Sequence, residues 1–528
     1  MTAAEPAAPS TMAALLEEQA AAKGESPYMF FDERVISFAE LNRQVNRAAN
    51  GLAALGVGSG VGVAIMMPNE PEWLYLYWGT QKLSAYAVPV NTGLVGESLR
   101  HVIDDSDAQV LVVHPDFADS VAAVAGDLPK VRTFVLDTTE SPDAAVPEGW
   151  TTLAEVMDAS DADPGVAIDP GAISAIMYTS GTTGAPKGVV QRYGTVNPDG
   201  LKAFGAFVQP DDVIYTCLPV FHANALWLTC TRALAVGAPV ALSRKFSASR
   251  FWDEIRRYKV TTFNALGAMI PILMKQPERD SDRDNLVKTV FSAACPAEVW
   301  AAFEERFGVH IIEGYAATDG GGFATMNFGD GPKGSIGRSP APFRIIDDDG
   351  ADVPIGEPGE LIFEVDDPER RKVEYYKNAE AGAARIRAGW FHTGDLVTQD
   401  AEGWLYFVDR KTDSMRRRGE NISSWEVERE INAHPAVLES AVFGVPSELG
   451  EDDVMAVVVL KEGEELAPED LLSFVEPRMA KFMVPRYIEL RDELPKTETH
   501  RVQKGALKRD GVGPDTWDRE RAGTGGKA

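Results

Sequence analysis

The residues best suited to chemistry lie in one short segment, Ile176–Val189, which combines glycines and hydroxylated residues with a single lysine. Gly181 and Gly184 allow backbone N–H groups to turn toward an anion. Hydroxyl donors and one positive charge complete the set, and they come from Ser180, Thr182, Thr183 and Lys187. These groups can wrap the β- and γ-phosphates of a nucleotide. The segment therefore predicts a phosphate-binding loop, and its restrictive residue order disfavours the alternative of a Ser/Thr/Gly-rich surface turn.

Two better-known nucleotide motifs do not match this chain. A Walker A loop requires Gly-Lys-Ser/Thr in sequence, whereas Lys187 precedes Gly188 and Val189. The glycine-rich stretch 56–62 misses the spacing of the dinucleotide-binding fingerprint. The sequence thus argues against both a P-loop NTPase and a Rossmann dehydrogenase.

Four further segments follow the loop in a fixed order: 314–319 (GYAATD), 389–395 (GWFHTGD), 403–410 (GWLYFVDR) and 418–423 (RGENIS). Together with Tyr178–Gly188, they resemble the adenylate-forming superfamily of acyl-CoA synthetases, peptide-synthetase adenylation domains and luciferases. The resemblance covers roughly residues 25–510. Through Phe221-His222 and 479–485 (MAKFMVP), the pattern is most similar to crotonobetaine/carnitine-CoA ligase-like members.

The resemblance implies a role for each matching residue. The loop residues that would hold the phosphates are Thr179, Ser180, Gly181, Thr182, Thr183, Gly184 and Lys187. In the later motifs, Tyr315 would stack on adenine, Thr318 would touch the α-phosphate, Asp319 would bind Mg²⁺, Asp395 would bond the ribose hydroxyls, and Arg410 would contact ribose or phosphate. His222 lies in a motif near the acyl pocket. The expected walls of that pocket are Trp227, Asn264, Gly267 and Met269, for which a position in the core is the alternative.

Three positions depart from the family pattern. The family ends with Pro-Lys-Thr-x-Thr-Gly-Lys, and here Arg501 replaces the last lysine while His500 replaces the glycine. Arginine keeps the charge, but its planar fork is bulkier and recognises oxyanions bidentately. Thr412 stands at the hinge position that is usually Lys or Asp, and Asp319 stands where the family has Glu. Arg501 is still expected to act in adenylation, with Lys187, Thr318 and His222 as the other catalytic residues; a solvated surface arginine is the alternative.

The elements that must position these residues follow an α/β pattern. Ser37–Glu40 predicts a capped helix that runs to about Gly56, and 61–67 (VGVAIMM) predicts a buried strand. Similar helix–strand alternation at 250–263 and 424–445 indicates layered, largely parallel sheets. Short strands between about 340 and 410 predict a small β-rich subdomain. We expect an N-terminal adenylation domain at 1–410, a mobile α+β domain at 411–510 and a disordered tail at 511–528.

Composition limits the partners and the compartment. The chain has 528 residues, of which 45% are hydrophobic and 25% charged, as in an ordinary globular protein. A net charge of −29 argues against non-specific binding to nucleic acid or to anionic membranes. Three cysteines without a CxxC pair, no long uncharged apolar run and no secretory signal predict a cytoplasmic protein without an integral membrane segment.

These features lead to three hypotheses about function. The first is an ATP- and Mg²⁺-dependent carboxylic acid–CoA ligase that forms an acyl-adenylate and then rotates its C-terminal domain about 410–412. The second keeps adenylation with another acceptor, such as an amine, a carrier protein, or nitrite activated for diazotisation of an aryl amine. The third is a nucleotide-binding protein without turnover, which the presence of Lys187, Asp395 and Arg410 disfavours.

Overall fold

The structure is a computed structural model that describes most of the chain. The described residues are 11–179, 185–195, 208–266, 269–293, 295–317, 319–320, 324–347, 349–367, 372–410, 414–417, 420–447, 450–495, 502 and 504–522. Among the helices of these residues, none combines the length and the apolar character needed to cross a membrane.

Seven strands form the first sheet of the N-terminal body, in the order β7-β6-β5-β3-β4-β8-β9. Their bounds are β3 Gly62–Met66, β4 Tyr86–Pro89, β5 Ala108–Val113, β6 Thr133–Leu136, β7 Thr151–Thr152, β8 Ile173–Thr179 and β9 Lys187–Arg192. Neighbouring strands are parallel except β8 and β9, which form the antiparallel pair on either side of the predicted phosphate loop. Every residue of β3 is buried, as the apolar run at 61–67 predicts for a central parallel strand.

Eight strands form the second sheet, in the order β15-β14-β13-β12-β10-β11-β1-β2. Their bounds are β1 Pro27–Phe31, β2 Arg34–Ser37, β10 Ile214–Thr216, β11 Val240–Leu242, β12 Thr262–Leu266, β13 Thr289–Ala293, β14 His310–Ala316 and β15 Ala324–Asn327. The inner strands are parallel, and β2 and β15 are antiparallel edge strands. This arrangement places the ends of β12, β13 and β14 beside one another.

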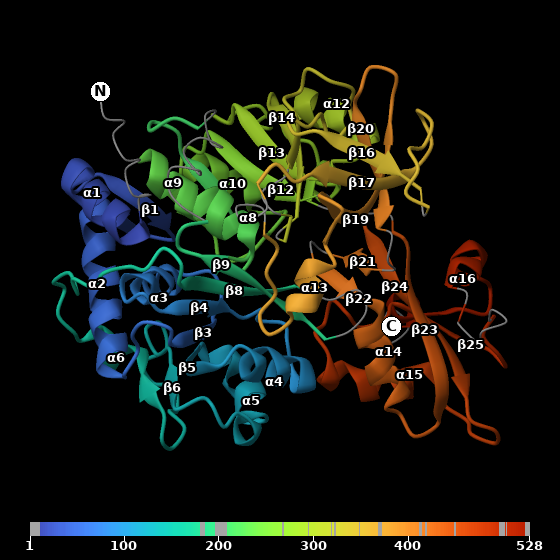
Figure 1. Ribbon diagram of the computed structural model, residues 1–528, viewed down its shortest axis with the longest axis horizontal. Coiled ribbons are helices and arrows are strands. Elements are labelled where there is room, and N and C mark those ends of the chain that lie inside the picture. Colours follow the sequence, from blue (N-terminus) through green and yellow to red (C-terminus); the bar gives the residue numbers. More distant parts are fainter. Residues whose placement is uncertain are drawn as a thin grey trace.

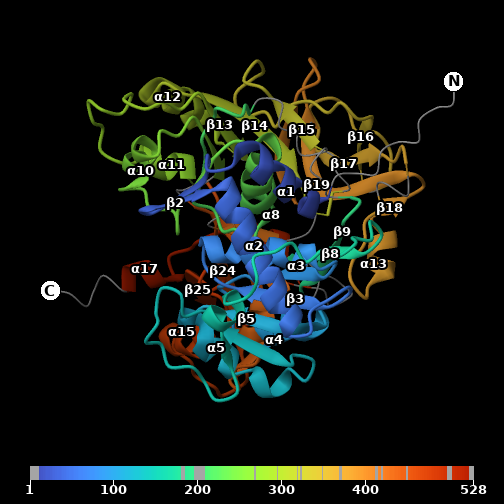
Figure 2. The same cartoon turned by 90° about the vertical axis from the view of Figure 1, so that its left-hand side faces the viewer.

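Helices fill the space between and around the two sheets. Those of the N-terminal body are α1 Met12–Lys23, α2 Phe38–Ala54, α3 Pro71–Lys82, α4 Gly96–Asp105, α5 Ala118–Ala122, α6 Leu153–Met157, α8 Ala223–Ala225, α9 Arg232–Val236, α10 Phe251–Arg257, α11 Met269–Met274, α12 Ala297–Phe307 and α13 Ala379–Ala383. Helix α2 contacts β1 and β2 of the second sheet, helix α3 contacts β3 and β4 of the first sheet, and the two helices pack against each other between the sheets (Figure 2). One hydrophobic core joins side chains from both sheets and these helices, so the body is a single packed unit.

The beginning and end of α2 follow the predicted signals. Ser37 is its N-cap, and its hydroxyl accepts a hydrogen bond from the backbone N–H of Glu40 at 3.0 Å. Gly56 follows the C-cap residue Leu55 with a φ of +87°, a left-handed conformation that glycine adopts at little cost.

A third, antiparallel sheet follows the body, at the position where the sequence predicts a β-rich subdomain. It contains β16 Phe343–Ile346, β17 Gly359–Glu364, β18 Ile386–Arg387, β19 Trp390–Gln399 and β20 Leu405–Arg410. In Figure 1 these strands lie at the upper right of the body, between β14 and the C-terminal elements. The sheet matters for the site because β19 carries Asp395 and pairs it with Arg410 of β20.

The C-terminal elements begin with a hairpin of β21 Ser414–Arg417 and β22 Glu420–Ser423. Helices α14 Ser424–Asn432, α15 Pro468–Val475 and α16 Lys504–Asp510 accompany a four-stranded sheet of β23 Val437–Pro446, β24 Asp452–Leu460, β25 Tyr487–Leu490 and β26 Trp517–Asp518. Hydrophobic clusters separate from that of the body hold this unit together. The predicted boundary at 410/411 falls where β20 ends, and Thr412 lies outside the described residues; the boundary stays a prediction.

The C-terminal segment differs from the expected disordered tail. Strand β26 pairs antiparallel with β25, and α17 follows at Arg519–Ala522. Trp517 packs partly buried against the C-terminal core and its Nε1 donates to Glu469 at 2.7 Å. Asp518 lies 3.3 Å from Nε of Arg486. The described residues 511–522 therefore contain a strand and a helix where the sequence predicts a disordered tail. Trp517 and the ion pairs of Arg486 with Asp518 and Glu520 hold this segment of otherwise polar composition to the C-terminal unit.

Candidate active site

The predicted phosphate loop joins β8 to β9, and both of its strand ends are described. Thr179 pairs with Lys187 at the loop end of this hairpin, while Ser180–Gly184 lie outside the described residues. The Lys187 ammonium lies 5.6 Å from the ring centroid of Tyr375. Gly188 has no room for a side chain, since a Cβ there would lie 2.6 Å from an atom of Ile176. The hairpin thus delivers Lys187 to a fixed position beside Tyr375.

Strands β14 and β19 bring the predicted adenine and ribose residues together. Tyr315 lies near the end of β14, and its hydroxyl donates a short hydrogen bond to Oδ2 of Asp395. Asp395 is buried, and its backbone N–H donates to Oγ1 of Thr393 at 3.0 Å. The Tyr315 ring also lies 6.4 Å from that of Phe407 on β20. A buried carboxylate held by a phenol beside an aromatic pair suits a nucleoside whose vicinal hydroxyls donate to the acid.

Asp319, the expected metal ligand, already has two partners. The hydroxyl of Tyr375 donates a short hydrogen bond to its Oδ2, and Nη2 of Arg385 lies 3.2 Å from the same oxygen. Burial, followed by the charge of Asp319, raises the pKa of Tyr375, so the phenol remains a donor at neutral pH. Sequence reasoning missed Tyr375 and Arg385, because neither belongs to a motif and the chain folding alone brings them to Asp319.

Asp319 is the residue that the resemblance assigns to Mg²⁺, and the number of metal ligands around it decides what kind of metal site it can form. Among the described residues, no group of three or more His, Cys, Asp or Glu side chains is arranged to hold a metal. Mg²⁺ in nucleotide sites is commonly bound by one or two carboxylates together with phosphates and water. A single carboxylate at Asp319 therefore fits a metal that arrives with a nucleotide and does not fit a resident metal centre.

His222 meets a residue from the C-terminal hairpin. Its Nε2 lies 2.9 Å from Oε1 and 3.0 Å from Oε2 of Glu420, which begins β22. Asn91 of the N-terminal body donates from Nδ2 to the same carboxylate at 3.2 Å. Near Asn91, a Cβ at Gly93 would lie 3.1 Å from the Phe482 ring. The N-terminal body and the C-terminal unit therefore approach each other closely at this point. Glu420 belongs to the segment 418–423 that the sequence singled out, but its contact with His222 was not predicted.

Two of the predicted acyl-pocket residues, Asn264 and Trp227, make polar contacts, whereas Met269 packs in the hydrophobic core. Asn264 is buried, and its Nδ2 donates to Asn224 Oδ1 at 2.7 Å and to Thr229 Oγ1 at 2.9 Å. Trp227 is partly exposed and donates from Nε1 to the Tyr77 hydroxyl at 3.3 Å. Met269 is buried in the main hydrophobic core, as the alternative reading of it expected. Trp227 and Thr229 lie in a π-helical segment, Leu226–Thr231, a feature that is frequent at functional sites.

Several predicted residues cannot be placed. Thr318, Gly267 and Arg501 lie outside the described residues, as does the side chain of Arg410, whose backbone is described. Lys504, the basic residue nearest to Arg501 in the described chain, bonds Ser424 and Glu428 of its own domain, each at 2.7 Å. The roles of Thr318, Arg410 and Arg501 therefore stay predictions.

Comparisons with known proteins agree with this arrangement. Residues 16–365 match the family model described as AMP-binding enzyme, and residues 426–501 match the AMP-binding enzyme C-terminal domain. A crotonobetaine/carnitine–CoA ligase of Salmonella choleraesuis is 33% identical over 489 residues, which is 90% of this chain and 93% of the relative.

Two solved structures are similar over nearly the whole chain. The anthranilate CoA ligase AuaEII in complex with anthranoyl-AMP has a TM-score of 0.71 and 26% identity, covering 97% of this chain and 99% of the other. A Mycobacterium tuberculosis fatty acyl CoA synthetase has a TM-score of 0.67 and 26% identity, covering 95% and 98%. The chain therefore belongs to the AMP-binding enzyme family, which confirms the predicted α/β fold and the resemblance to adenylate-forming ligases.

Proposed function

We propose that the protein is an ATP-dependent carboxylic acid–CoA ligase that works through an acyl-adenylate. A carboxylate oxygen of the acid attacks the α-phosphorus of ATP, and the bond to pyrophosphate breaks. The CoA thiol then attacks the acyl carbon, the C–O bond to AMP breaks, and the thiol proton is released. The observation that carries this proposal is the contact of His222 with Glu420, which joins the acyl side of the body to the C-terminal hairpin.

The adenylation step uses the nucleotide side of the site. Asp395, held by Tyr315, binds the ribose, and Lys187 supplies positive charge to the phosphates. Mg²⁺ bound with the nucleotide would neutralise phosphate charge, and Asp319 is the residue to hold it. Arg501 is the proposed cation at the α-phosphate. Rate enhancement in such a step comes mainly from in-line positioning and charge neutralisation.

The thioester step uses the opposite side. His222, Glu420 and Asn91 form a polar contact between the body and the C-terminal unit, next to the close approach of Gly93 and Phe482. A thiol that reaches the acyl carbon here meets a carboxylate–imidazole pair suited to holding or accepting its proton. The Asn224–Asn264–Thr229 network gives the neighbouring acyl region a polar wall, which favours a small acid over a long apolar one.

Two experiments test this proposal. Mass spectrometry of the products from a panel of acids, with ATP and with or without CoA, is expected to show acyl-CoA and AMP. Activity only with nitrite and an aryl amine, or only with an amine acceptor, would replace the CoA ligase by the corresponding alternative. The cytoplasm, which is the proposed location, supplies ATP and CoA, and its reducing conditions suit a chain with three buried cysteines.

Single-turnover measurement of the half-reactions separates the two sides. Glu420→Gln is expected to slow thioester formation from pre-made acyl-adenylate about tenfold and to leave adenylation unchanged. Arg501→Ala is expected to slow adenylation and to leave thioester formation from pre-made acyl-adenylate unchanged. Glu462→Gln, at an exposed position of the same domain, is the matched control. Equal loss in both half-reactions for Glu420→Gln would contradict its assignment to the second step.

A further inference from the structure

Arg385 stands out because it binds the carboxylate that is expected to take the metal. Its Nη2 lies 3.2 Å from Oδ2 of Asp319, and both side chains are about four-fifths buried, with 22% and 19% exposed. The Tyr375 hydroxyl donates to the same oxygen. An arginine stays charged at any working pH, so Asp319 carries a permanent counter-cation supplied by the protein.

The guanidinium is held in place by the segment that carries the ribose-binding residue. Nη1 of Arg385 donates to the carbonyl oxygen of Thr393 at 3.1 Å, and its Cζ lies 5.0 Å from the ring centroid of Phe391. Gly394 lies against it, since a Cβ at that position would be 3.4 Å from Nη1. One side chain thus connects the part of β19 just before Asp395 with the phosphate end of the site at Asp319.

A divalent metal at Asp319 would meet this guanidinium directly. Mg²⁺ and Mn²⁺ need a free carboxylate lone pair in an octahedral shell, whereas the bonded oxygen of Asp319 already accepts from a phenol and a guanidinium. Two cations that share one carboxylate oxygen also repel each other. We propose that Arg385 competes with the divalent cation for Asp319, so that it weakens metal binding to the enzyme–nucleotide complex.

This inference rests on the proposed function only in requiring that a nucleotide binds here. The test measures Mn²⁺ binding by the loss of the free-ion paramagnetic resonance signal, with the full-length protein in molar excess over ATP, so that no free ATP competes for the metal, and no acid present. Arg385→Met removes the guanidinium. Arg385→Gln removes the charge but keeps an N–H donor for the Thr393 carbonyl, and Asp319→Asn removes the shared carboxylate.

Mn²⁺ is expected to bind about tenfold more tightly to Arg385→Met and to Arg385→Gln than to the wild type, as for the loss of one charge-assisted contact. In the Asp319→Asn background, the same changes are expected to have no effect. Thermal unfolding identifies any variant that fails to fold. If Arg385→Met is not folded, Mn²⁺ binding to Arg385→Gln tests the inference. Unchanged or weaker Mn²⁺ binding in the folded variants, or an equal gain without Asp319, would overturn the inference. Calorimetry that finds no ATP binding to the wild type would instead refute the proposed function.

Discussion

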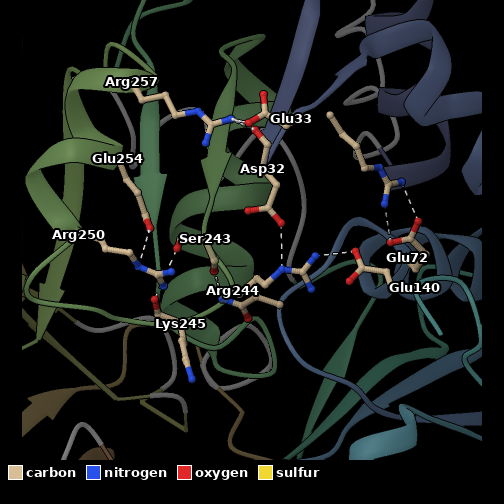
Figure 3. Close-up of polar contacts among 12 residues, drawn as sticks. Asp32, Glu33, Glu72, Glu140, Ser243, Arg244, Lys245, Arg250, Glu254 and Arg257 are labelled. Atoms are coloured by element: carbon tan, nitrogen blue, oxygen red, sulfur yellow. Dashed lines mark hydrogen bonds and ion pairs between the residues drawn. The ribbon is translucent and has the colours of Figure 1, made fainter.

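The carboxyl group of Glu70 gives a quantitative test of the packing between the two large sheets. Glu70 occupies the N-cap position of α3 without a side-chain capping hydrogen bond, and it is fully buried. Burial, followed by the negative charge of Asp137, raises the pKa of Glu70 from its ordinary value of 4.5 to about 10. Close by, Glu72 pairs with Arg34. Glu140 pairs with Arg244, and Figure 3 shows this contact. Glu70 is therefore neutral at pH 7 in the folded chain and ionised in the unfolded chain.

The sign of the pH dependence follows from this difference. Because the pKa is raised on folding, the contribution of Glu70 to stability is fully present below pH 4.5 and is lost as the pH rises toward 10. Each pH unit in this window costs ~1.4 kcal/mol, so about 5 kcal/mol is lost by pH 8. Glutamine has the same size and takes up no proton. We expect Glu70→Gln to be more stable than the wild type, by an amount that grows by ~1.4 kcal/mol per pH unit between pH 5.5 and 8.5.

Guanidinium unfolding followed by tryptophan fluorescence measures this difference. Trp73 and Trp78 lie fully buried in α3, so the signal reports on the helix that Glu70 begins. Glu18→Gln, at an exposed position of α1, is the control and should show no pH-dependent change. A difference between Glu70→Gln and the wild type that stays constant from pH 5.5 to 8.5 would refute the reasoning, because it would mean that no proton is taken up by this group on folding.

The ribose contact, a buried ion pair and the cysteines each provide another test. Tyr315→Phe removes the donor to Asp395 and is expected to weaken ATP binding about tenfold by calorimetry; unchanged affinity would show that the phenol does not position the carboxylate. Arg306→Met leaves Asp282 buried without its cation and is expected to cost about 3–5 kcal/mol of unfolding free energy in guanidinium, whereas a loss below ~1 kcal/mol would contradict the pairing. All the cysteines are buried, and burial raises the pKa of two of their thiols to about 12. We therefore expect Ellman's reagent at pH 8 to react with them only after denaturation. Rapid reaction of the native protein would contradict their burial. These residues are Cys217, Cys230 and Cys295, the first two with the raised pKa.

Sequence patterns predicted the parts of the site whose residues are neighbours along the chain. The strand that enters the predicted phosphate loop and the capped helix after Ser37 each depend on local signals within about ten residues, and the structure has both. Composition was misleading for the C-terminal segment, where the contacts of Trp517 and the ion pairs of Arg486 hold residues of polar composition in place.

Pairs that meet across long separations could not be predicted in this way. His222 and Glu420 are 198 residues apart, and Tyr375 and Asp319 are 56 apart. Their approach depends on how the third sheet and the C-terminal hairpin pack against the body, which no local pattern encodes. Arg385 lies in the turn between the alanine-rich helix α13 and strand β18, where its charge gives no sign of the carboxylate that it meets.

The two sides of the site differ in how they are built, and this difference bears on mechanism. Tyr315 and Asp395 are joined within the N-terminal part of the chain, on strands buried in its sheets, so their contact does not involve the C-terminal unit. His222 and Glu420 are joined only while the hairpin Ser414–Ser423 lies against the body. A movement of the C-terminal unit would therefore break the His222 contact and leave the ribose contact intact. In the mechanism that we propose, the nucleotide stays bound in one geometry while the groups presented to the acyl carbon are exchanged, as a two-step ligase requires.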